Sequence, residues 1–315
     1  DSARNFLASC APNAILFTGG DNDTFPLWYV QEVEGFRTDV RVIVLSYFIT
    51  DWYVKQMTRS VNESPALDFT LEYNNFKKGS NDVVYITDRF ENVSLVDYLK
   101  LLKSESDFLK LPYGESGTIN TVPSRTLTLD VDLDSIDDME VVPEAFNDQK
   151  IPKLNFHLKG NYFTKDTLML LDLIATNEWE RPIYFNNTSL ATIGIDLTNH
   201  VVMEGLTYRL LPIKKPDNQE ELVNTEVAYA NVTKEFSFRG MDNPHNYFDD
   251  QYRRFTSNHR STLYTISNAL MNEGEMDRAR DIQLLSLEKM PHEAIPYDLA
   301  SGLSVSMLFE LGLDE

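Results

Sequence analysis

The sequence contains very little cysteine, because Cys10 is the only one among 315 residues. A single thiol excludes an intramolecular disulfide framework and any metal site built from several cysteines. It does not identify a compartment, since proteins of oxidising and reducing compartments alike can carry few cysteines. The hydrophobic share of 42% is ample for a buried core, which excludes disorder for most of the chain.

Long hydrophobic runs are also missing, and basic residues are few. The best apolar run, VRVIVLSYFI, has about half the 18 or more residues that a spanning helix needs. The chain has 28 Lys and Arg against 49 Asp and Glu, a formal net charge of −21. Binding to nucleic acid or to anionic lipid head groups requires clustered Lys and Arg. We therefore predict no nucleic-acid partner.

The first third of the chain alternates between strand and helix patterns. The apolar runs AILFT and RVIVLSY are typical of buried strands. A helix pattern follows each run, the first with Asp23 or Thr24 as its N-cap and the second with Thr50 or Asp51. Later strands are predicted at DVVYI and RPIYF. This order predicts an α/β fold with a Rossmann-like, open parallel sheet.

Two regions differ from this pattern. The segment TLTLDVDLDSI alternates between apolar and polar residues, which predicts a half-buried strand in a β-rich insertion at about 111–160. From residue 246 onward the spacing becomes helical, and Gly274 and Pro291 separate helices of tetratricopeptide-like length. We predict two domains: a Rossmann-like α/β domain at 1–245 and a tetratricopeptide-like helical appendage at 246–315.

The most specific local pattern is GGDNDTFP, at residues 19–26. Asp21 and Asp23 stand between a predicted strand and a predicted helix, at the edge where open α/β sheets bind ligands. Gly19 and Gly20 permit close approach of a ligand to the main chain, and the helix start favours an anion. Asp-x-Asp is also a pattern with which nucleotide-sugar transferases hold a divalent metal. The structural alternative is that Asp23 caps the helix and Asp21 orders the turn.

Further polar residues are expected at the same edge if the strands are parallel neighbours. Asp51 would then emerge beside GGDND, and Asn186 would emerge after RPIYF. Trp28 or Trp52 would offer a stacking face for a sugar, with packing in the core as the alternative. The predicted ligand-binding residues are Gly19, Gly20, Asp21, Asp23, Thr24, Asp51, Trp52 and Asn186. Asp21 and Asp23 are candidates for a divalent cation, and no other cofactor is predicted.

Other signatures of catalysis are missing from the sequence. There is no GxSxG, no Walker loop and no GxGxxG, and the five histidines lack the spacing of metal ligands. Cys10 has no evident histidine partner. We therefore predict no catalytic residue, and the residues alone do not decide whether the chain is an enzyme.

Longer blocks of the sequence resemble one family. APNAILFTGGDNDTFPLWYVQEVEGFRTDVRVIVLSYFITDWYVKQM resembles the signature stretch of the DUF2723 family of Bacteroidetes membrane proteins, and later blocks are LMLLDLIATNEWERPIYF, MEGLTYRLLPIK and FRGMDNPHNYFDDQYRRF. The family is similar to transmembrane protein O-mannosyltransferases of the GT-C class, which use lipid-linked sugar donors. The resemblance implies a soluble, C-terminal and periplasmic part of a polytopic membrane protein, with the catalytic acid upstream of residue 1.

The resemblance also implies an accessory function. The chain would position a protein or glycan acceptor over the membrane-embedded site of its own parent protein, without being catalytic alone. Its implied partners are the acceptor and the parent's membrane-spanning region. The eukaryotic relatives keep the first Gly-Asp of GGDND but not the second Asp, which favours Asp21 over Asp23. Two alternatives are a protein-interaction module acting through the C-terminal helices, and a metal- and nucleotide-sugar-dependent transferase using Asp21 and Asp23.

Overall fold

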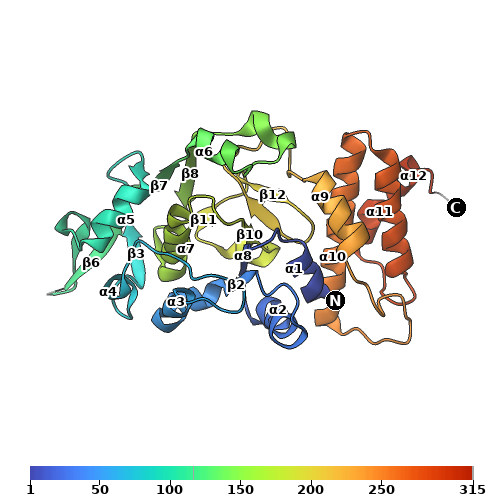
Figure 1. Ribbon diagram of the computed structural model, residues 1–315, viewed down its shortest axis with the longest axis horizontal. Helices are drawn as coiled ribbons and strands as arrows, with labels where there is room; N and C mark the ends of the chain where they lie inside the picture. Colours follow the sequence, from blue (N-terminus) through green and yellow to red (C-terminus); the bar gives the residue numbers. More distant parts are fainter. Residues whose placement is uncertain (116, 314–315) are drawn as a thin grey trace.

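The structure is a computed structural model that describes residues 1–115 and 117–313, with the main chain only for 299 and 300. Residue 116 of the predicted insertion and residues 314 and 315 of the predicted helical appendage lie outside the described residues. The molecule is elongated, with small sheets toward one end and helices at the other (Figure 1). The predicted α/β class is confirmed in its broad form, as three mixed sheets followed by C-terminal helices.

A five-stranded sheet lies in the middle of the molecule (Figure 1). Its strands, in spatial order, are β12 (Val201–Met203), β13 (Tyr208–Leu210), β10 (Ile183–Phe185), β1 (Ile15–Thr18) and β2 (Arg41–Val44). β1 pairs in parallel with both β2 and β10, as predicted. β13 pairs with β12 in antiparallel fashion, because the short turn between them can join only antiparallel strands. β13 is also antiparallel to β10. The sheet is therefore mixed and not wholly parallel.

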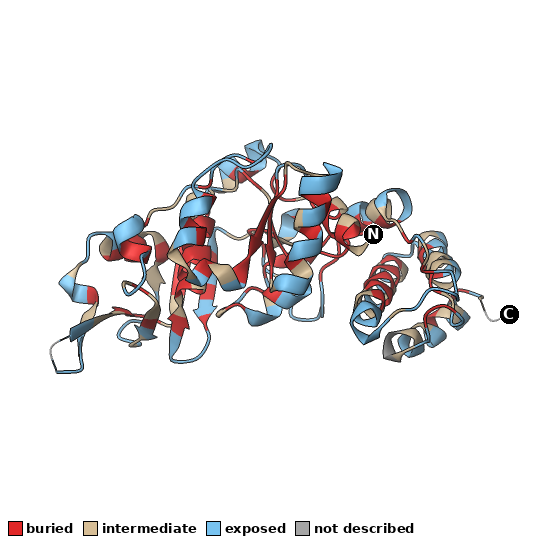
Figure 2. Cartoon of the chain, turned by 90° about the horizontal axis from the view of Figure 1, so that it is seen from below, coloured by how far each residue is buried: buried red, intermediate tan, exposed pale blue. Residues whose placement is uncertain are grey.

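Helices connect and cover the parallel strands of this sheet. The helical segments are α1 (Ser2–Ala8), α2 (Asp21–Glu34), η1 (Leu45–Ile49), α3 (Asp51–Met57), α7 (Lys165–Thr176) and α8 (Asn187–Thr192). α2 ends at Gly35, whose left-handed φ of 63° is typical of a helix C-terminus. Every residue of β1, β2 and β10 is buried, which explains why these strands are continuous apolar runs and not alternating patterns (Figure 2).

Two four-stranded sheets form the end of the molecule that lies away from the C-terminal helices (Figure 1). One contains β11 (Ile195–Asp196), β8 (Lys153–Leu158), β7 (Thr126–Asp130) and β4 (Val93–Ser94), and the other contains β5 (Lys110–Tyr113), β6 (Gly117–Val122), β3 (Val83–Ile86) and β9 (Tyr162–Thr164). Short helices join them: α4 (Tyr73–Phe76), α5 (Leu95–Lys103), η2 (Asp107–Leu109), α6 (Leu133–Asp138) and η3 (Glu144–Gln149). The strand predicted at DVVYI is present as β3, outside the central sheet.

The long strand predicted from TLTLDVDLDSI is only half correct. β7 covers its first five residues, and α6 replaces the remainder from Leu133 onward. The reason is a helix cap: the Asp132 side chain accepts hydrogen bonds from the main-chain N–H groups of Asp134 and Ser135. This local bond stabilises a helix start and overrides the alternating pattern.

The last part of the chain is helical, as predicted. Its segments are α9 (Thr225–Ala230), η4 (Asn231–Glu235), α10 (Asp250–Asn272), α11 (Met276–Lys289) and α12 (Leu299–Glu310). Buried residues of α10 share one hydrophobic cluster with Met203 and Val223 of the α/β part. Among the described residues, no helix combines the length and apolar content needed to cross a bilayer. The domain boundary at 245 stays a prediction.

Candidate functional site

The carboxyl ends of the three parallel strands meet at one edge of the central sheet. The main-chain N–H of Asn186 and the hydroxyl of Ser189 donate to the carbonyl oxygen of Phe17, at 3.0 and 2.8 Å. The Thr18 hydroxyl donates to the carbonyl oxygen of Ile43 at 3.2 Å. The segments that follow β1, β2 and β10 are therefore in direct contact, as the sequence predicts. Ligand binding at this edge stays a prediction.

The two glycines of GGDND differ in their surroundings. A Cβ atom on Gly19 would lie 2.5 Å from Cγ2 of Thr188 and 3.2 Å from Oδ2 of Asp23, whereas a Cβ atom on Gly20 would meet nothing within 4 Å. Gly20 is extended at φ −159°, which any residue can adopt. Gly19 is thus required where two segments of the protein approach each other, and Gly20 faces open space.

Replacing Gly19 with alanine is expected to lower the free energy of unfolding by about 1–3 kcal/mol, the usual cost of forcing an extra methyl group into a packed site. Gly20→Ala is the matched control and should change it by less than about 0.5 kcal/mol. Urea unfolding followed by circular dichroism measures both. Thr188→Ser removes the crowding methyl group, so Gly19→Ala should cost much less in that background. An equal cost in both backgrounds would show that crowding is not the cause.

Asp21 and Asp23 both lie in the first turn of α2, where carboxylates interact favourably with the helix dipole. The N-cap is Gly20, so the prediction of Asp23 or Thr24 as the cap is wrong. The helix begins earlier than the sequence pattern suggested. Thr24 is buried, and its hydroxyl oxygen lies 2.7 Å from both the carbonyl oxygen of Gly20 and the hydroxyl of Thr18. Thr24 therefore fastens α2 to β1.

A continuous row of side chains runs from α2 across η1 and α3 to α4. The Tyr47 hydroxyl donates to Oδ1 of Asp21 at 3.2 Å, and the rings of Tyr47 and Trp52 are 6.2 Å apart. The Tyr73 hydroxyl donates to Oδ2 of Asp51 at 3.4 Å. We call these five residues, with Phe25 and Trp28, the aromatic row.

The aromatic row is open to solvent over much of its length. Trp52 is 57% exposed, Tyr73 49% and Phe25 45%. The expectation that Trp52 packs in the core is therefore wrong. Trp28 is partly buried against the core, and its ring stacks on that of Phe25 at 5.6 Å. Phe25 lies one helical turn after Asp21, so both are on the same face of α2.

Tyr47 is the centre of the row and is kept protonated. Desolvation, and then the hydrogen bond to the Asp21 carboxylate, raise the pKa of Tyr47. A tyrosine phenol is protonated at neutral pH in any case, so Tyr47 donates its hydrogen bond to Asp21 there. Asp51 also accepts from the main-chain N–H of Lys78 at 3.4 Å. Both carboxylates keep free acceptor positions for a ligand, since each oxygen can accept two hydrogen bonds.

Asn186 is not part of the exposed row. It is 1% exposed, and its side-chain oxygen caps α8 by accepting from the main-chain N–H of Ser189 at 2.8 Å. The predicted crevice is thus brought together only in part. Asp21, Asp51 and Trp52 lie along one exposed row, whereas Asn186 and Thr24 form the buried support beneath the edge.

Metal binding at this edge would need help from other groups. Within residues 1–115 and 117–313, no three His, Cys, Asp or Glu side chains are grouped so that they could hold a metal ion. A cation at Asp21 and Asp23 would therefore take its remaining oxygen ligands from hydroxyl groups, the main chain, water or a bound substrate. The residues present do not form a complete site.

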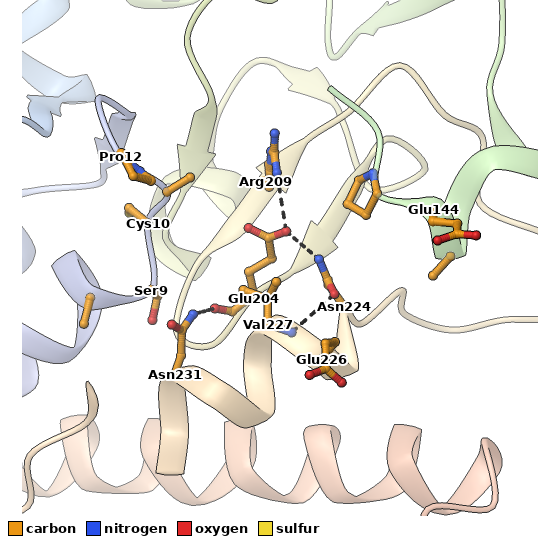
Figure 3. A pocket seen from close by; sticks show the side chains of 14 residues that line it. Ser9, Cys10, Pro12, Glu144, Glu204, Arg209, Asn224, Glu226, Val227 and Asn231 are labelled. Atoms are coloured by element: carbon orange, nitrogen blue, oxygen red, sulfur yellow. Dashed lines mark hydrogen bonds and ion pairs between the residues drawn. The ribbon is translucent and has the colours of Figure 1, made fainter. Parts of the chain in front are cut away.

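A second feature, which the sequence did not predict, is a cavity of about 820 Å³ behind the β12–β13 hairpin (Figure 3). We call it the Glu204 cavity. It is lined by the chain after α1 (8–12), the segment 143–145, Glu204 and Arg209 of the hairpin, and residues of α9 and η4. Figure 3 shows the Glu204 carboxylate directed toward Arg209 and Asn224. The cavity therefore lies between the end of α1 and the start of the helical region.

The Glu204 carboxylate is fully enclosed by partners. Glu204 is 2% exposed. Its Oε1 accepts from the Asn224 side-chain amide at 2.8 Å and lies 3.7 Å from Nη1 of Arg209, and its Oε2 accepts from the Tyr184 hydroxyl. Asn231 also donates to the Glu204 main-chain oxygen at 2.8 Å. A buried carboxylate needs partners of this kind to offset its desolvation.

The Tyr184 phenol and the Cys10 thiol near Glu204 are harder to deprotonate than these groups usually are. Burial, and then the charge of Glu204, raise the pKa of Tyr184 well above its usual value. Burial raises the pKa of the Cys10 thiol to about 12, so this cysteine is not a nucleophile at neutral pH. The Nε–H group of Arg209 is buried and has no hydrogen-bond partner among the described residues.

One sequence signal could have pointed to this network. Glu204 directly follows the apolar run VVM and precedes Gly205, so a carboxylate stands in a segment that is otherwise typical of a buried strand. A charged residue in such a position requires a buried partner. The partners themselves lie up to twenty residues away, at Tyr184 and Asn224. Short spacing rules do not reveal them.

The fold and the site together define a mixed α/β domain with a polar edge and a helical C-terminal region. The family described as TMEM260-associated domain 2 matches residues 1–227, which cover the three sheets and the start of α9. The chain belongs to this family. The family's name associates the domain with the transmembrane protein TMEM260. Comparison with curated proteins and with solved structures gave no match.

Proposed function

We propose that this chain is an extracytoplasmic domain of a polytopic membrane glycosyltransferase-like protein. In this proposal it positions a protein or glycan acceptor and does not catalyse transfer alone. Membership of the TMEM260-associated family supports the link to a membrane protein. The DUF2723 resemblance supports the glycosyltransferase-like parent and a periplasmic location. Positioning by a noncatalytic domain can lower a reaction barrier by several kcal/mol.

The observation that carries the proposal is the aromatic row with its two carboxylates. Sugar rings present apolar C–H faces and hydroxyl edges, which match exposed aromatic faces beside carboxylate acceptors. Trp52 supplies the most exposed ring of the row, and Asp21 and Asp51 supply the acceptors. The row lies at the carboxyl edge of parallel strands, where α/β sheets bind ligands. This position is also our basis for proposing that the core is Rossmann-like.

Trp52→Ala is expected to weaken binding of neutral oligosaccharides about tenfold, because it removes the largest stacking surface of the row. Isothermal titration of the chain with a panel of neutral oligosaccharides measures the change. Tyr252→Ala is the matched control, since Tyr252 is 62% exposed but lies on α10. Trp52→Phe should retain most of the affinity. Equal losses in the Trp52→Ala and Tyr252→Ala variants would contradict a site at the row.

The wider role is tested in the full-length parent protein. Deleting this chain should reduce transfer to the acceptor, and Trp52→Ala should raise the KM for the acceptor while kcat changes little. Transfer that is unchanged after the deletion would overturn the proposed function. A loss of binding to oligosaccharides with normal transfer would overturn only the role of the row.

A further inference from the structure

A groove of about 940 Å³ lies between the α/β part and α10. This volume falls within the range of about 300–1,000 Å³ that is typical of ligand sites. Side-chain amides line it from several elements: Gln149 of η3, Asn187 of α8, Asn218 and Gln219 of the segment after β13, and Asn268 and Asn272 of α10. We call it the amide groove. It is separate from the aromatic row, and no residue of the row lines it.

The two walls of the amide groove both present polar groups to solvent. On α10, Tyr264, Asn268 and Asn272 follow one another at intervals of four residues, which places them on one face of the helix. Asn268 and Asn272 are exposed, as is Asn218 on the opposite wall. The Asn187 amide is also exposed but already donates to Asn258 of α10 at 3.1 Å and accepts from the main-chain N–H of Thr188 at 3.0 Å. A hydrogen bond links the two walls, since the Thr225 hydroxyl donates to Glu273, directly after α10, at 2.7 Å.

Amides on both walls suit an extended polypeptide. Each Asn or Gln side chain carries both a donor and an acceptor, and so does each peptide group. An extended main chain presents its N–H and C=O groups on both sides, so a groove with amides on both walls can pair with it along its length. One such group already lacks a partner, since Oε1 of Gln149 is buried without a hydrogen bond among the described residues.

The charge of the groove selects the kind of polypeptide. Four carboxylates line it, those of Glu220, Glu221, Glu226 and Glu273, and none of its lining residues is Lys, Arg or His. Two cations nearby offset part of this charge. Lys215 donates to the main-chain oxygens of Gln219 and Glu220, and Arg278 pairs with Glu226 at 2.9 Å. The remaining negative charge favours a partner rich in Lys and Arg.

We propose that the amide groove binds an extended, basic segment of a partner protein. The main chain of that segment pairs with the amides of both walls, and its basic side chains meet the carboxylates. This proposal does not depend on binding of sugars at the aromatic row. It names a second site, on a different part of the molecule, for a different chemical class of ligand.

Fluorescence anisotropy with a fluorescein-labelled peptide of alternating lysine and serine tests the proposal. Asn268→Ala combined with Asn272→Ala should weaken binding about tenfold, since each amide contributes a hydrogen bond to the peptide. Glu220→Gln should weaken it about two- to fivefold at low salt. A peptide of alternating glutamate and serine should not bind measurably. Thermal unfolding of each variant confirms that the fold is retained.

The amide variants are the decisive comparison, because the whole chain is acidic and attracts any basic peptide to some extent. Substitution of asparagine leaves the net charge unchanged, so it separates the groove from general attraction. Asn92→Ala is the matched control, at an exposed asparagine outside the groove. Affinity that is the same in the double variant and in Asn92→Ala would overturn the proposal. Equal binding of the glutamate–serine peptide would overturn it as well.

Discussion

Glu204→Ala is expected to lower the free energy of unfolding by about 3–5 kcal/mol, the cost of removing one partner from a buried ion pair. The substitution leaves the Tyr184 hydroxyl, the Asn224 amide and the Arg209 guanidinium without their shared acceptor. The Tyr184 hydroxyl and the Asn224 amide then lose the acceptor of their donated hydrogen bonds, and the Arg209 guanidinium keeps its bond to the carbonyl oxygen of Val141 but loses its counter-charge. Urea unfolding of the wild type and the variant measures the difference.

Glu226→Ala is the matched control for this substitution. Glu226 lines the same cavity, but its side chain is 80% exposed and forms only a surface ion pair with Arg278. Its removal should change the free energy of unfolding by less than about 1 kcal/mol. A loss of similar size in the two variants would mean that the Glu204 network does not stabilise the fold. A small loss in Glu204→Ala alone would mean that water replaces the carboxylate.

Acid should destabilise the protein through His259 of α10, which is 1% exposed and contacts Asn5 of α1. Its Nδ1 lies 2.7 Å from the carbonyl oxygen of Phe255, and its Nε2 lies 3.1 Å from the side-chain amide of Asn5. Burial lowers the pKa of His259 from 6.5 to about 4. Between these two pKa values the unfolded chain binds a proton that the folded protein does not. The free energy of unfolding therefore decreases as the pH falls.

Each pKa unit corresponds to 1.36 kcal/mol, so the free energy of unfolding is expected to be about 3 kcal/mol lower at pH 4 than at neutral pH. His259→Gln retains polar contacts but cannot take up the proton, so its unfolding free energy should depend less on pH between 6.5 and 4. Urea unfolding at a series of pH values compares the two proteins. Carboxylates with lowered pKa, such as Asp39 and Asp82, act mainly below this window. Parallel curves for the two proteins would contradict a neutral, buried His259.

Local patterns predicted the elements that depend on neighbouring residues. The β-branched runs before GGDND and before Asp51 became β1 and β2, and α2 and α3 follow them as expected. The parallel pairing of β1 with β2 and β10 also followed from the order of elements. This is why Asp21 and Asp51 could be placed at one edge before the structure was known.

Features that depend on distant parts of the chain could not be predicted in this way. β4 and β11 have only two residues each, and such strands exist because a partner strand pairs with them. The side-chain burial of Asn186 and Thr24 depends on how closely β10 and α2 approach β1. Core packing was the alternative to a stacking face for Trp52, and the 57% exposure of this side chain depends on how α3 sits against its neighbours, which no local pattern gives.

The contacts of α1 have a consequence for how the protein is made. Asn5 is hydrogen-bonded to Ser237 and to His259, which are 232 and 254 residues further along the chain. α1 is therefore synthesised more than 230 residues before these two partners. The apolar side chains of Phe6 and Leu7 share a hydrophobic cluster with Tyr184 and Leu206, so they also stay uncovered until these later residues have been made. At about 5–20 residues per second, the helix waits for more than ten seconds before the fold can close over it.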